Sequence, residues 1–216
     1  LAVMFPWRGV DGLDAVREVA EPGAVECDAL VDPARPIVLV PLRASHALAP
    51  GIAPGLAEVG AFLPYSPLHQ LLLEALRGPV VATSGNVSGE PVLTEPAQAE
   101  ARLAQVADAF LHHDRPIVRP ADDSVVRVIA GRARPIRLGR GVAPLELELP
   151  QALPEPVLAV GGHLKATVAL AWDRRVVVSP HIGDMGTLRS EQVFAQVESR
   201  GFLVGSRSRR LVQGWL

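Results

Sequence analysis

Short apolar runs alternate along the first half of the chain with segments whose apolar residues recur every three or four positions. The runs are rich in Val, Leu and Ile and are bounded by proline or glycine, which is typical of buried strands. The longer period is typical of amphipathic helices. The predicted strands are 36–42, 59–63 and 79–82, and the predicted helices are 13–20, 68–76 and 94–106. This alternation predicts α/β layers.

The boundaries of two of these helices are marked in the sequence. Ser66 followed by Pro67 predicts a serine N-cap with proline at the first helical position. Gly78 predicts the end of the same helix. In the later helix Thr94 is the expected N-cap, with Pro96 inside the first turn. The leucines that make one apolar face of the earlier helix are Leu68, Leu71, Leu72 and Leu76.

The second half of the chain is dominated by patterns typical of strands. A hairpin that carries several arginines is expected over 125–138, with its turn at Gly131. The Pro-rich stretch 142–156 predicts a stiff extended connection, although its alternating residues 145–149 could form a strand on a neighbour. A strand at 157–160 and a second hairpin, 167–179, follow.

Composition limits what the chain can be. Its 216 residues suggest one domain of ordinary size, or one plus a fragment, and with 49% hydrophobic but 4% aromatic residues the core must consist of Leu, Val and Ala. A net charge of −2 argues against nucleic-acid binding by bulk positive charge. The single Cys27 excludes an intrachain disulfide and predicts a reducing, cytoplasmic location. No apolar run reaches the ~20 residues that span a bilayer.

The first residues, Leu1 to Pro6, lack an initiator methionine and the basic start of a signal peptide. They are typical of a chain that is already inside a strand, which predicts that further sequence precedes residue 1.

One loop concentrates groups suited to ligand binding: Thr83-Ser84-Gly85-Asn86-Val87-Ser88-Gly89-Glu90-Pro91. It lies between a predicted strand and a predicted helix, which is where open α/β sheets bind ligands. Its glycines allow close approach of the backbone, with N–H groups free to face an anion. Its hydroxyl and amide groups can orient a phosphate, a carbonyl or a carboxylate. The alternative interpretation is a polar turn.

Three other segments could carry chemistry. The arginines of the 125–138 hairpin could converge on a phosphate, or could only make an edge hairpin soluble. The turn that begins at Gly161 could cradle phosphate, although it lacks the full phosphate-loop pattern. The pair His112-His113 beside Asp114 invites a metal hypothesis, but adjacent residues of a strand point to opposite faces, so a polar loop is favoured.

Four motifs, in this order and at natural spacings, resemble a known family. They are Leu63-Pro64-Tyr65-Ser66-Pro67-Leu68-His69, the Thr83–Pro91 loop, His113-Asp114-Arg115-Pro116-Ile117 and Asp122-Asp123-Ser124-Val125-Val126-Arg127. Together they resemble the YrdC-like domain of the HypF family, the carbamoyltransferases that mature nickel–iron hydrogenases. The resemblance covers roughly residues 1–197.

The resemblance implies an α/β fold, a twisted open mixed sheet of YrdC-like type whose concave face holds a nucleotide. A partial actin- and hexokinase-like hairpin segment follows it. In the family, carbamoyl phosphate is hydrolysed by a separate acylphosphatase domain. The YrdC-like domain joins the resulting carbamate to AMP from ATP. A further domain passes the carbamoyl group to a cysteine thiol of a partner protein, where it becomes the cyanide ligand of the hydrogenase iron.

The resemblance also implies which residues form the site. Ser84 and Asn86 match the Ser-x-Asn element that lines the nucleotide and acyl-adenylate pocket, and Ser124 faces the same pocket, which makes these three the catalytic candidates. ATP, with Mg²⁺, is the implied cofactor, whereas zinc belongs to family segments that this chain lacks. The implied nucleotide-binding residues are Thr83, Ser88, Arg119, Asp123, Arg137, Arg140, Gly161, Gly162 and Lys165.

The chain also departs from the family pattern. The family usually has Asn where this chain has Ala166, which leaves the phosphate contact of that turn open. The basic run that completes the nucleotide pocket of relatives is absent. The domains expected are a YrdC-like domain over 1–141, a Pro-rich linker over 142–156, the start of a carbamoyl-transfer domain over 157–197, and a divergent, disordered tail over 198–216.

Three further interpretations stay open. Threonylcarbamoyl-adenylate synthesis for tRNA modification is the second enzyme hypothesis, because the same domain family carries out both reactions. Double-stranded RNA binding is associated with YrdC-like domains, although the pI of about 6.3 disfavours it. The chain could also fold without activity. No membrane partner is expected.

Overall fold

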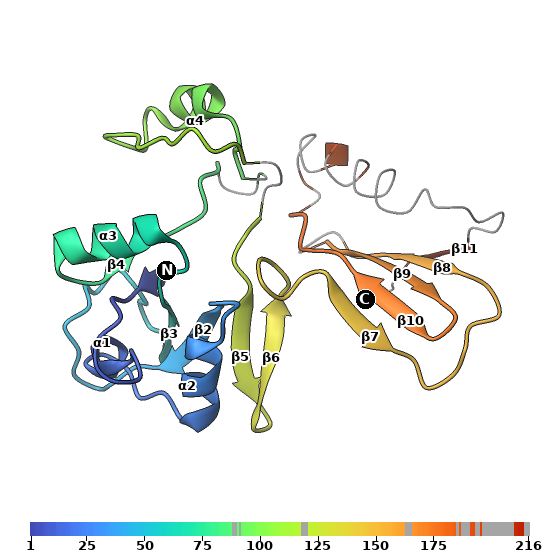
Figure 1. Cartoon of the computed structure of the whole chain (residues 1–216), viewed down its shortest axis with the longest axis horizontal. Coiled ribbons are helices and arrows are strands. Elements are labelled where there is room, and N and C mark those ends of the chain that lie inside the picture. Colours follow the sequence, from blue (N-terminus) through green and yellow to red (C-terminus); the bar gives the residue numbers. More distant parts are fainter. Residues whose placement is uncertain are drawn as a thin grey trace. The chain divides into compact units, whose positions relative to one another are not determined.

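The structure is a computed structural model that describes residues 1–87, 90, 92–117, 121–162, 166–184, 186, 191–192, 195 and 210–213. The chain divides into two units (Figure 1). The first unit comprises Leu1–Thr83 and Asp123–Val142, and the second comprises Ser84–Asp122 and Ala143–Leu216.

A six-stranded sheet in the order β4-β1-β3-β2-β5-β6 forms the centre of the first unit. The pairs β1/β3 and β2/β5 are parallel and the other neighbours are antiparallel, so the predicted mixed α/β sheet is confirmed. The strands are β1 (Ala2–Met4), β2 (Ile37–Pro41), β3 (Glu58–Phe62), β4 (Val80–Val81), β5 (Val125–Ile129) and β6 (Arg132–Arg137).

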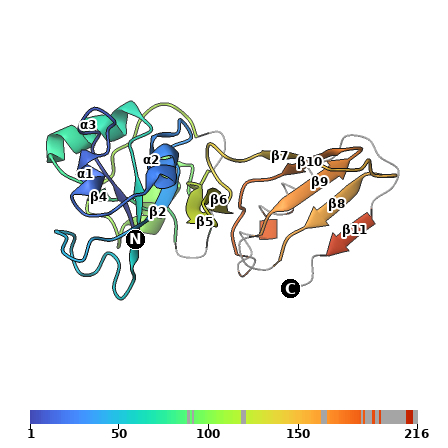
Figure 2. The same ribbon diagram turned by 90° about the horizontal axis from the view of Figure 1, so that it is seen from below.

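One face of this sheet carries the main core. Alternate residues of a strand share a face, so Val38 and Val40 of β2 point the same way as Val59 and Ala61 of β3. The short helices α1 (Asp14–Arg17) and α2 (Ala24–Val31) supply the apolar side chains opposite them, among them Val16 and Leu30, which are fully buried. Figure 2 shows α2 lying along β2 and β5, with which it is in contact.

The opposite face of the sheet is covered only in part. Met4, Ile37 and Phe62 form a small apolar cluster there with Leu73 of α3 (Pro67–Leu76). Beyond this cluster the face is open, because Glu58 is half-buried and Arg127 is exposed. The sheet therefore keeps one unfilled face, along β5 and β6, to which polar groups have access.

Helix α3 begins as predicted. The Ser66 side chain accepts a hydrogen bond from the His69 backbone N–H (3.2 Å), and Pro67 is the first helical residue. The helix ends at a left-handed residue, Arg77 (φ 57°), directly before Gly78. The predicted apolar face is largely uncovered: Leu73 is buried, whereas Leu68, Leu71, Leu72 and Leu76 are between 38% and 62% exposed.

The predicted helix in the second unit is shorter than expected. Helix α4 (Pro96–Leu103) has Glu95 at the N-cap and no side-chain cap, so the expectation of Thr94 as N-cap was wrong. None of its residues is buried. Its residues therefore supply no buried apolar contact that would stabilise a longer helix, to residue 106.

A five-stranded sheet in the order β11-β8-β9-β10-β7 lies in the second unit (Figure 2). Strand β7, from the Pro-rich stretch, pairs antiparallel with β10, which confirms the alternating strand predicted there. Strand β11 pairs parallel with β8, so the expectation of disorder over 198–216 was wrong for these four residues. The strands are β7 (Leu145–Glu148), β8 (Val157–Val160), β9 (Val168–Trp172), β10 (Arg175–Val178) and β11 (Arg210–Gln213).

Among the helices that the structure describes, none combines the length and the apolar character that crossing a membrane requires.

Candidate functional site

Asn86 organises the loop of the second unit that the sequence singled out. Its amide nitrogen donates to the carbonyl oxygens of Val87 (3.0 Å) and Glu90 (2.8 Å), and its Oδ1 accepts from the Ser84 hydroxyl (2.5 Å). The backbone N–H of Leu93 donates to the Gly85 carbonyl (2.9 Å) and closes the loop at its base. The Asn86 side chain therefore fixes the loop's shape, and the exposed Ser84 is the group left at its surface.

The setting of this loop differs from the prediction in one respect. Strand β4, which precedes it, is an edge strand that runs antiparallel to β1, so the loop does not follow a parallel strand. Thr83 is exposed at the end of the first unit, and nothing lies within 4 Å of a Cβ built on Gly85. The loop is thus open to a ligand because it is exposed, and not because it lies at a switch point of parallel strands.

In the first unit, Arg140 holds three segments together. Its Nε donates to Asp123 Oδ1 (3.0 Å), and its two terminal nitrogens donate to the carbonyl oxygens of Ala34 and Arg35 (2.8 Å each). Its guanidinium carbon lies 3.4 Å from the centroid of the Tyr65 ring. This arginine was a predicted phosphate ligand, but in this geometry its charge is paired and its donors serve the fold.

Ser124 has a comparable structural task. Its hydroxyl donates to the Arg140 carbonyl (3.0 Å) and accepts from the Gly139 N–H (2.9 Å), and the residue is fully buried. A hydroxyl that is satisfied on both sides and shielded from solvent is not available to a ligand. The predicted catalytic role of Ser124 stays a prediction that this geometry does not favour.

Arg137 is the arginine of this region with donors to spare. Its Nε donates to the Asp123 carbonyl oxygen (2.9 Å), which fixes the direction of the half-exposed side chain. Its two terminal nitrogens have no partner among the residues that the structure describes. Arg137 is therefore better suited than Arg140 to the predicted contact with phosphate.

Tyr65 and His69 belong to the same cluster, and their motif in the sequence predicted no individual role for either residue. Their rings meet edge to face, with centroids 4.5 Å apart. Burial raises the pKa of the Tyr65 phenol, and the charge of Asp123 adds to this. Burial lowers the pKa of His69, so the imidazole is neutral near pH 7. The alternation of polar and apolar residues could not reveal this grouping, because it depends on β6 returning to the β3–α3 connection.

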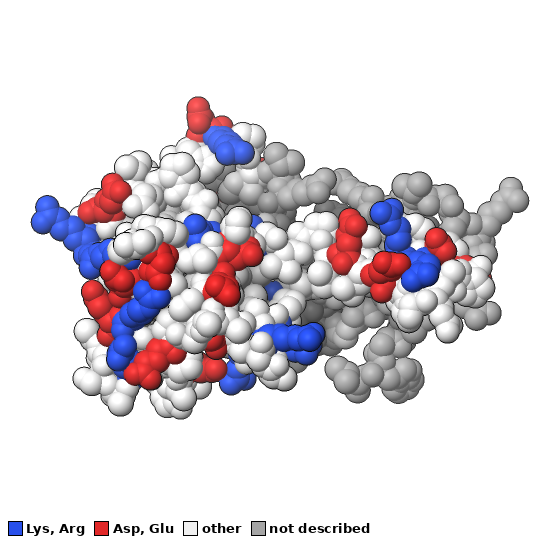
Figure 3. Space-filling model, turned by 60° about the horizontal axis from the view of Figure 1, so that its bottom comes forward, with Lys and Arg blue, Asp and Glu red and all other residues white. Residues whose placement is uncertain are grey.

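The open sheet face carries two arginines directly opposite each other. Arg127 of β5 pairs with Arg134 of β6 in the antiparallel register. Like charges in such a pair repel, and Glu58 offsets this by bonding the Arg127 guanidinium, with its Oε2 2.9 Å from a terminal nitrogen. Figure 3 shows acidic and basic side chains interspersed over the face in view, without one continuous basic surface.

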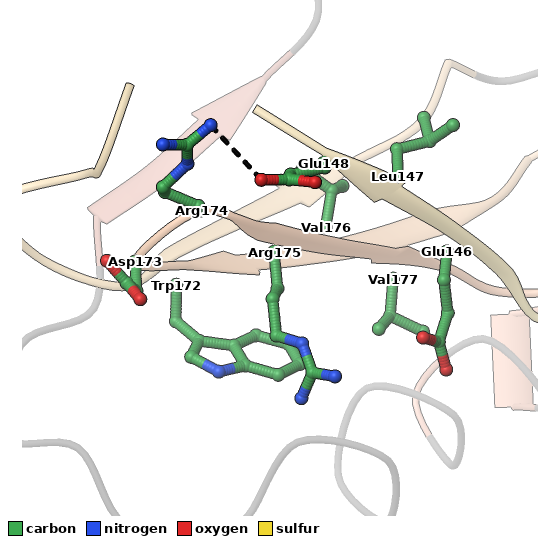
Figure 4. A pocket seen from close by; sticks show the side chains of 9 residues that line it. All are labelled: Glu146, Leu147, Glu148, Trp172, Asp173, Arg174, Arg175, Val176 and Val177. Atoms are coloured by element: carbon green, nitrogen blue, oxygen red, sulfur yellow. Dashed lines mark ion pairs between the residues drawn. The ribbon is translucent and has the colours of Figure 1, made fainter. Parts of the chain in front are cut away.

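A hollow of about 510 Å³ lies on the sheet of the second unit, on β7 and the β9–β10 hairpin. In Figure 4 the side chains of Trp172, Arg175 and Glu146 point to the same side, while Arg174 forms an ion pair with Glu148 (3.1 Å). Of the predicted phosphate turn, the described residues Gly161 and Gly162 are not among those that line this hollow. Gly161 is required there by packing, because a Cβ would meet the Thr167 backbone at 2.7 Å, whereas Gly162 faces open space.

Three predicted ligand residues, Ser88, Arg119 and Lys165, lie outside the described residues. His112 lies 2.9 Å from a carboxylate oxygen of Glu100. Within the described ranges, no group of three or more His, Cys, Asp or Glu is arranged to hold a metal ion.

The family of the chain follows from its similarity to known proteins. Residues 7–139 match the Sua5/YciO/YrdC family model, which is described as telomere recombination, and residues 152–202 match the HypF Kae1-like domain. The chain belongs to the Sua5/YciO/YrdC family.

The particular relatives are HypF proteins. The chain is 43% identical over 196 residues to the carbamoyltransferase HypF of Synechocystis, an alignment that covers 91% of this chain and 25% of that protein. The chain thus spans about a quarter of the curated relative's length. Relatives of this chain are therefore transferase enzymes, and the predicted resemblance to HypF is confirmed.

Solved HypF structures have the same fold. Full-length HypF in its phosphate- and nucleotide-bound form superposes with a TM-score of 0.87 at 36% identity, over 97% of this chain and 33% of that chain. HypF of T. kodakarensis superposes with a TM-score of 0.88 at 30% identity, over 98% of this chain and 27% of that one.

Proposed function

We propose that the chain is the part of a HypF-type carbamoyltransferase that binds ATP and forms carbamoyl-adenylate. The observation that carries this proposal is the similarity, over 97% of the chain, to a HypF structure described as phosphate- and nucleotide-bound. The exposed Ser/Asn/Gly loop and the half-exposed Arg137 carry hydrogen-bond donors of the kind that a nucleotide needs.

The reaction joins carbamate to AMP. A carboxylate oxygen of carbamate attacks the α-phosphorus of ATP, a new P–O bond forms, the bond to the bridging oxygen breaks, and pyrophosphate leaves. Negative charge grows on the α-phosphate oxygens, so hydrogen-bond donors fixed in advance lower the barrier. In this proposal Ser84, in a loop of the second unit that Asn86 keeps in shape, and Arg137 of the first unit are each a candidate for such a donor.

Mg²⁺ accompanies ATP in this proposal. Because the described residues hold no cluster of metal ligands, the phosphates of ATP would supply most of its coordination. Within a whole HypF protein, carbamate would come from carbamoyl phosphate. The carbamoyl group would go to a cysteine thiol of a partner protein during nickel–iron hydrogenase maturation.

The match of residues 152–202 to the HypF Kae1-like domain favours this function over threonylcarbamoyl-adenylate synthesis. A product assay separates them. The chain is incubated with Mg·ATP and ammonium bicarbonate, which contains carbamate at equilibrium, with and without L-threonine. Mass spectrometry should detect carbamoyl-adenylate in both mixtures. A product that appears only with threonine would support the alternative, and no adenylate in either would refute both.

A further inference from the structure

The Ser84 loop is held in shape mainly by bonds between its own residues. The Asn86 side chain bonds the Ser84 hydroxyl and the Glu90 carbonyl, and the Glu90 N–H donates to the Val87 carbonyl (2.9 Å). These bonds join residues at most four positions apart in the sequence. They therefore fix the inside of the loop, but they do not fix the loop against the rest of the second unit.

Glu90 also makes a bond that leaves the loop. Its carboxylate Oε2 lies 2.6 Å from a terminal nitrogen of Arg102, twelve residues further along the chain on α4. The Glu90 side chain is 19% exposed and the Arg102 side chain is 41% exposed, so the ion pair is partly shielded from water. Glu90 thus carries both contacts, because its carbonyl accepts from the Asn86 amide and its carboxylate accepts from the Arg102 guanidinium.

Helix α4 depends on such polar contacts, because it lacks apolar packing. None of its residues is buried, and a helix of eight residues is marginal in water by itself. Within the described residues, its side chains bond other segments in two places: Arg102 bonds Glu90, and Glu100 bonds His112 (2.9 Å). Residues two apart on a helix point to nearly opposite sides, so α4 connects the Ser84 loop on one side with the segment of His112 on the other.

We propose that Arg102 is a positioning residue of the Ser84 loop, which it holds through Glu90 and Asn86. This inference rests on the proposed function and deepens it, because it adds a contact from outside the loop to the candidate donor Ser84. A partly exposed ion pair contributes little to the stability of the whole chain. Its effect falls instead on the fraction of molecules whose loop is already in place, and a ligand binds more weakly in proportion as that fraction decreases.

Amide exchange tests this positioning without any ligand. The Leu93 N–H bonds the Gly85 carbonyl at the base of the loop (2.9 Å), so its exchange, followed by NMR, reports how often the loop opens. Arg102→Gln should speed this exchange about two- to fivefold, in line with the coupling of partly exposed ion pairs. The control is Glu95→Gln at the N-cap of α4, an exposed residue whose side chain makes no cap bond. It should leave the exchange unchanged.

Kinetics then connects the loop to the reaction. Carbamate-dependent exchange of labelled pyrophosphate into ATP is measured at increasing ATP for the parent, Arg102→Gln, Glu90→Gln and the variant with both changes. Each single change should raise the KM for ATP about two- to fivefold and leave the maximum rate within about twofold, because bound ATP brings the loop back into place. The double change should be no worse than either single change, because both act through one ion pair. Arg102→Lys keeps the charge and should recover part of the loss.

The inference is overturned if the Leu93 amide of Arg102→Gln exchanges like that of the parent, or if Glu95→Gln speeds its exchange equally. It is also overturned if the Arg102 and Glu90 changes multiply their effects on KM, because residues that act independently behave in that way. A parent chain without pyrophosphate exchange contradicts the proposed function instead. Amide exchange still decides in that case whether Arg102 holds the loop, so the two failures are distinguishable.

Discussion

The guanidinium carbon of Arg140 lies over the ring of Tyr65, 3.4 Å from its centroid, and the same guanidinium bonds the carbonyls of Ala34 and Arg35. Three segments distant in sequence thereby meet at one side chain: the end of β6, the α2–β2 connection and the β3–α3 connection. Arg140 is consequently a positioning residue of the first unit, whereas the terminal nitrogens of Arg137 have no partner within the described residues.

Replacing Arg140 should destabilise the first unit. Arg140→Ala removes bonds to two backbone carbonyls, the partner of the Asp123 carboxylate and a cation–π contact, and we expect a loss of about 2–4 kcal/mol. Urea unfolding followed by circular dichroism measures this loss. The control is Arg132→Ala on the exposed end of β6, which should change the free energy of unfolding by less than about 0.5 kcal/mol. Equal effects would contradict the assignment.

Ser124→Ala should cost stability, and Ser84→Ala should not. Removing the Ser124 hydroxyl leaves the buried Gly139 N–H without its acceptor, which costs about 1–3 kcal/mol. The Ser84 hydroxyl is exposed, so water replaces its single bond to Asn86. Thermal unfolding of the two variants separates these cases. A stable Ser124→Ala variant that has lost ATP turnover would restore the catalytic role predicted from the sequence.

The leucines of α3 should differ sharply in their effect on stability. Leu73 is 1% exposed in an apolar cluster, so Leu73→Ala should cost about 2–5 kcal/mol. Leu71 is 62% exposed, so Leu71→Ala should cost less than about 0.5 kcal/mol. Chemical denaturation measures both values. A large cost at Leu71 would mean that the exposed face of α3 is covered in solution.

His69 should make stability depend on pH. Its pKa is lowered in the folded chain by burial, so the unfolded chain binds more protons as the pH falls through the unfolded value of about 6.5. The contribution is fully present above that value and is lost toward the lower folded pKa. Unfolding free energies measured from pH 7.5 to 5 should therefore fall less steeply for His69→Gln than for the parent. Identical slopes would contradict the lowered pKa.

The elements that were predicted well from the sequence depend on residues that are close together in the sequence. The Ser66 side chain caps α3 by bonding the backbone N–H three residues later. The alternating residues 145–149 form a strand once an adjacent strand is there to pair with. Thr94 was wrongly predicted as the N-cap, because Asp, Ser and Thr side chains form equally good hydrogen bonds to nearby backbone groups outside helices. The leucine pattern of α3 predicted a helix correctly but not which leucine the sheet would bury.

The candidate site was predictable where a loop carries its own donors, and less so where it depends on tertiary contacts. Ser84 and Asn86 are two residues apart and bond each other, so their grouping follows from the sequence. Ser124, Arg137 and Arg140 lie close together, but which of them is buried or paired depends on the return of β6 to the rest of the unit. Tyr65 and His69 had no role predicted for the same reason.

Isotope exchange tests most directly whether the chain uses carbamate and ATP. The chain is mixed with Mg·ATP, ammonium bicarbonate and labelled pyrophosphate, and label entering ATP is counted. We predict that the exchange requires carbamate. We also predict that Asn86→Ala, which loosens the Ser84 loop, slows the exchange about tenfold or more without unfolding the chain. Two results would contradict the account. One is that the parent shows no exchange, even with an acylphosphatase and carbamoyl phosphate added. The other is that Asn86→Ala leaves the exchange rate unchanged.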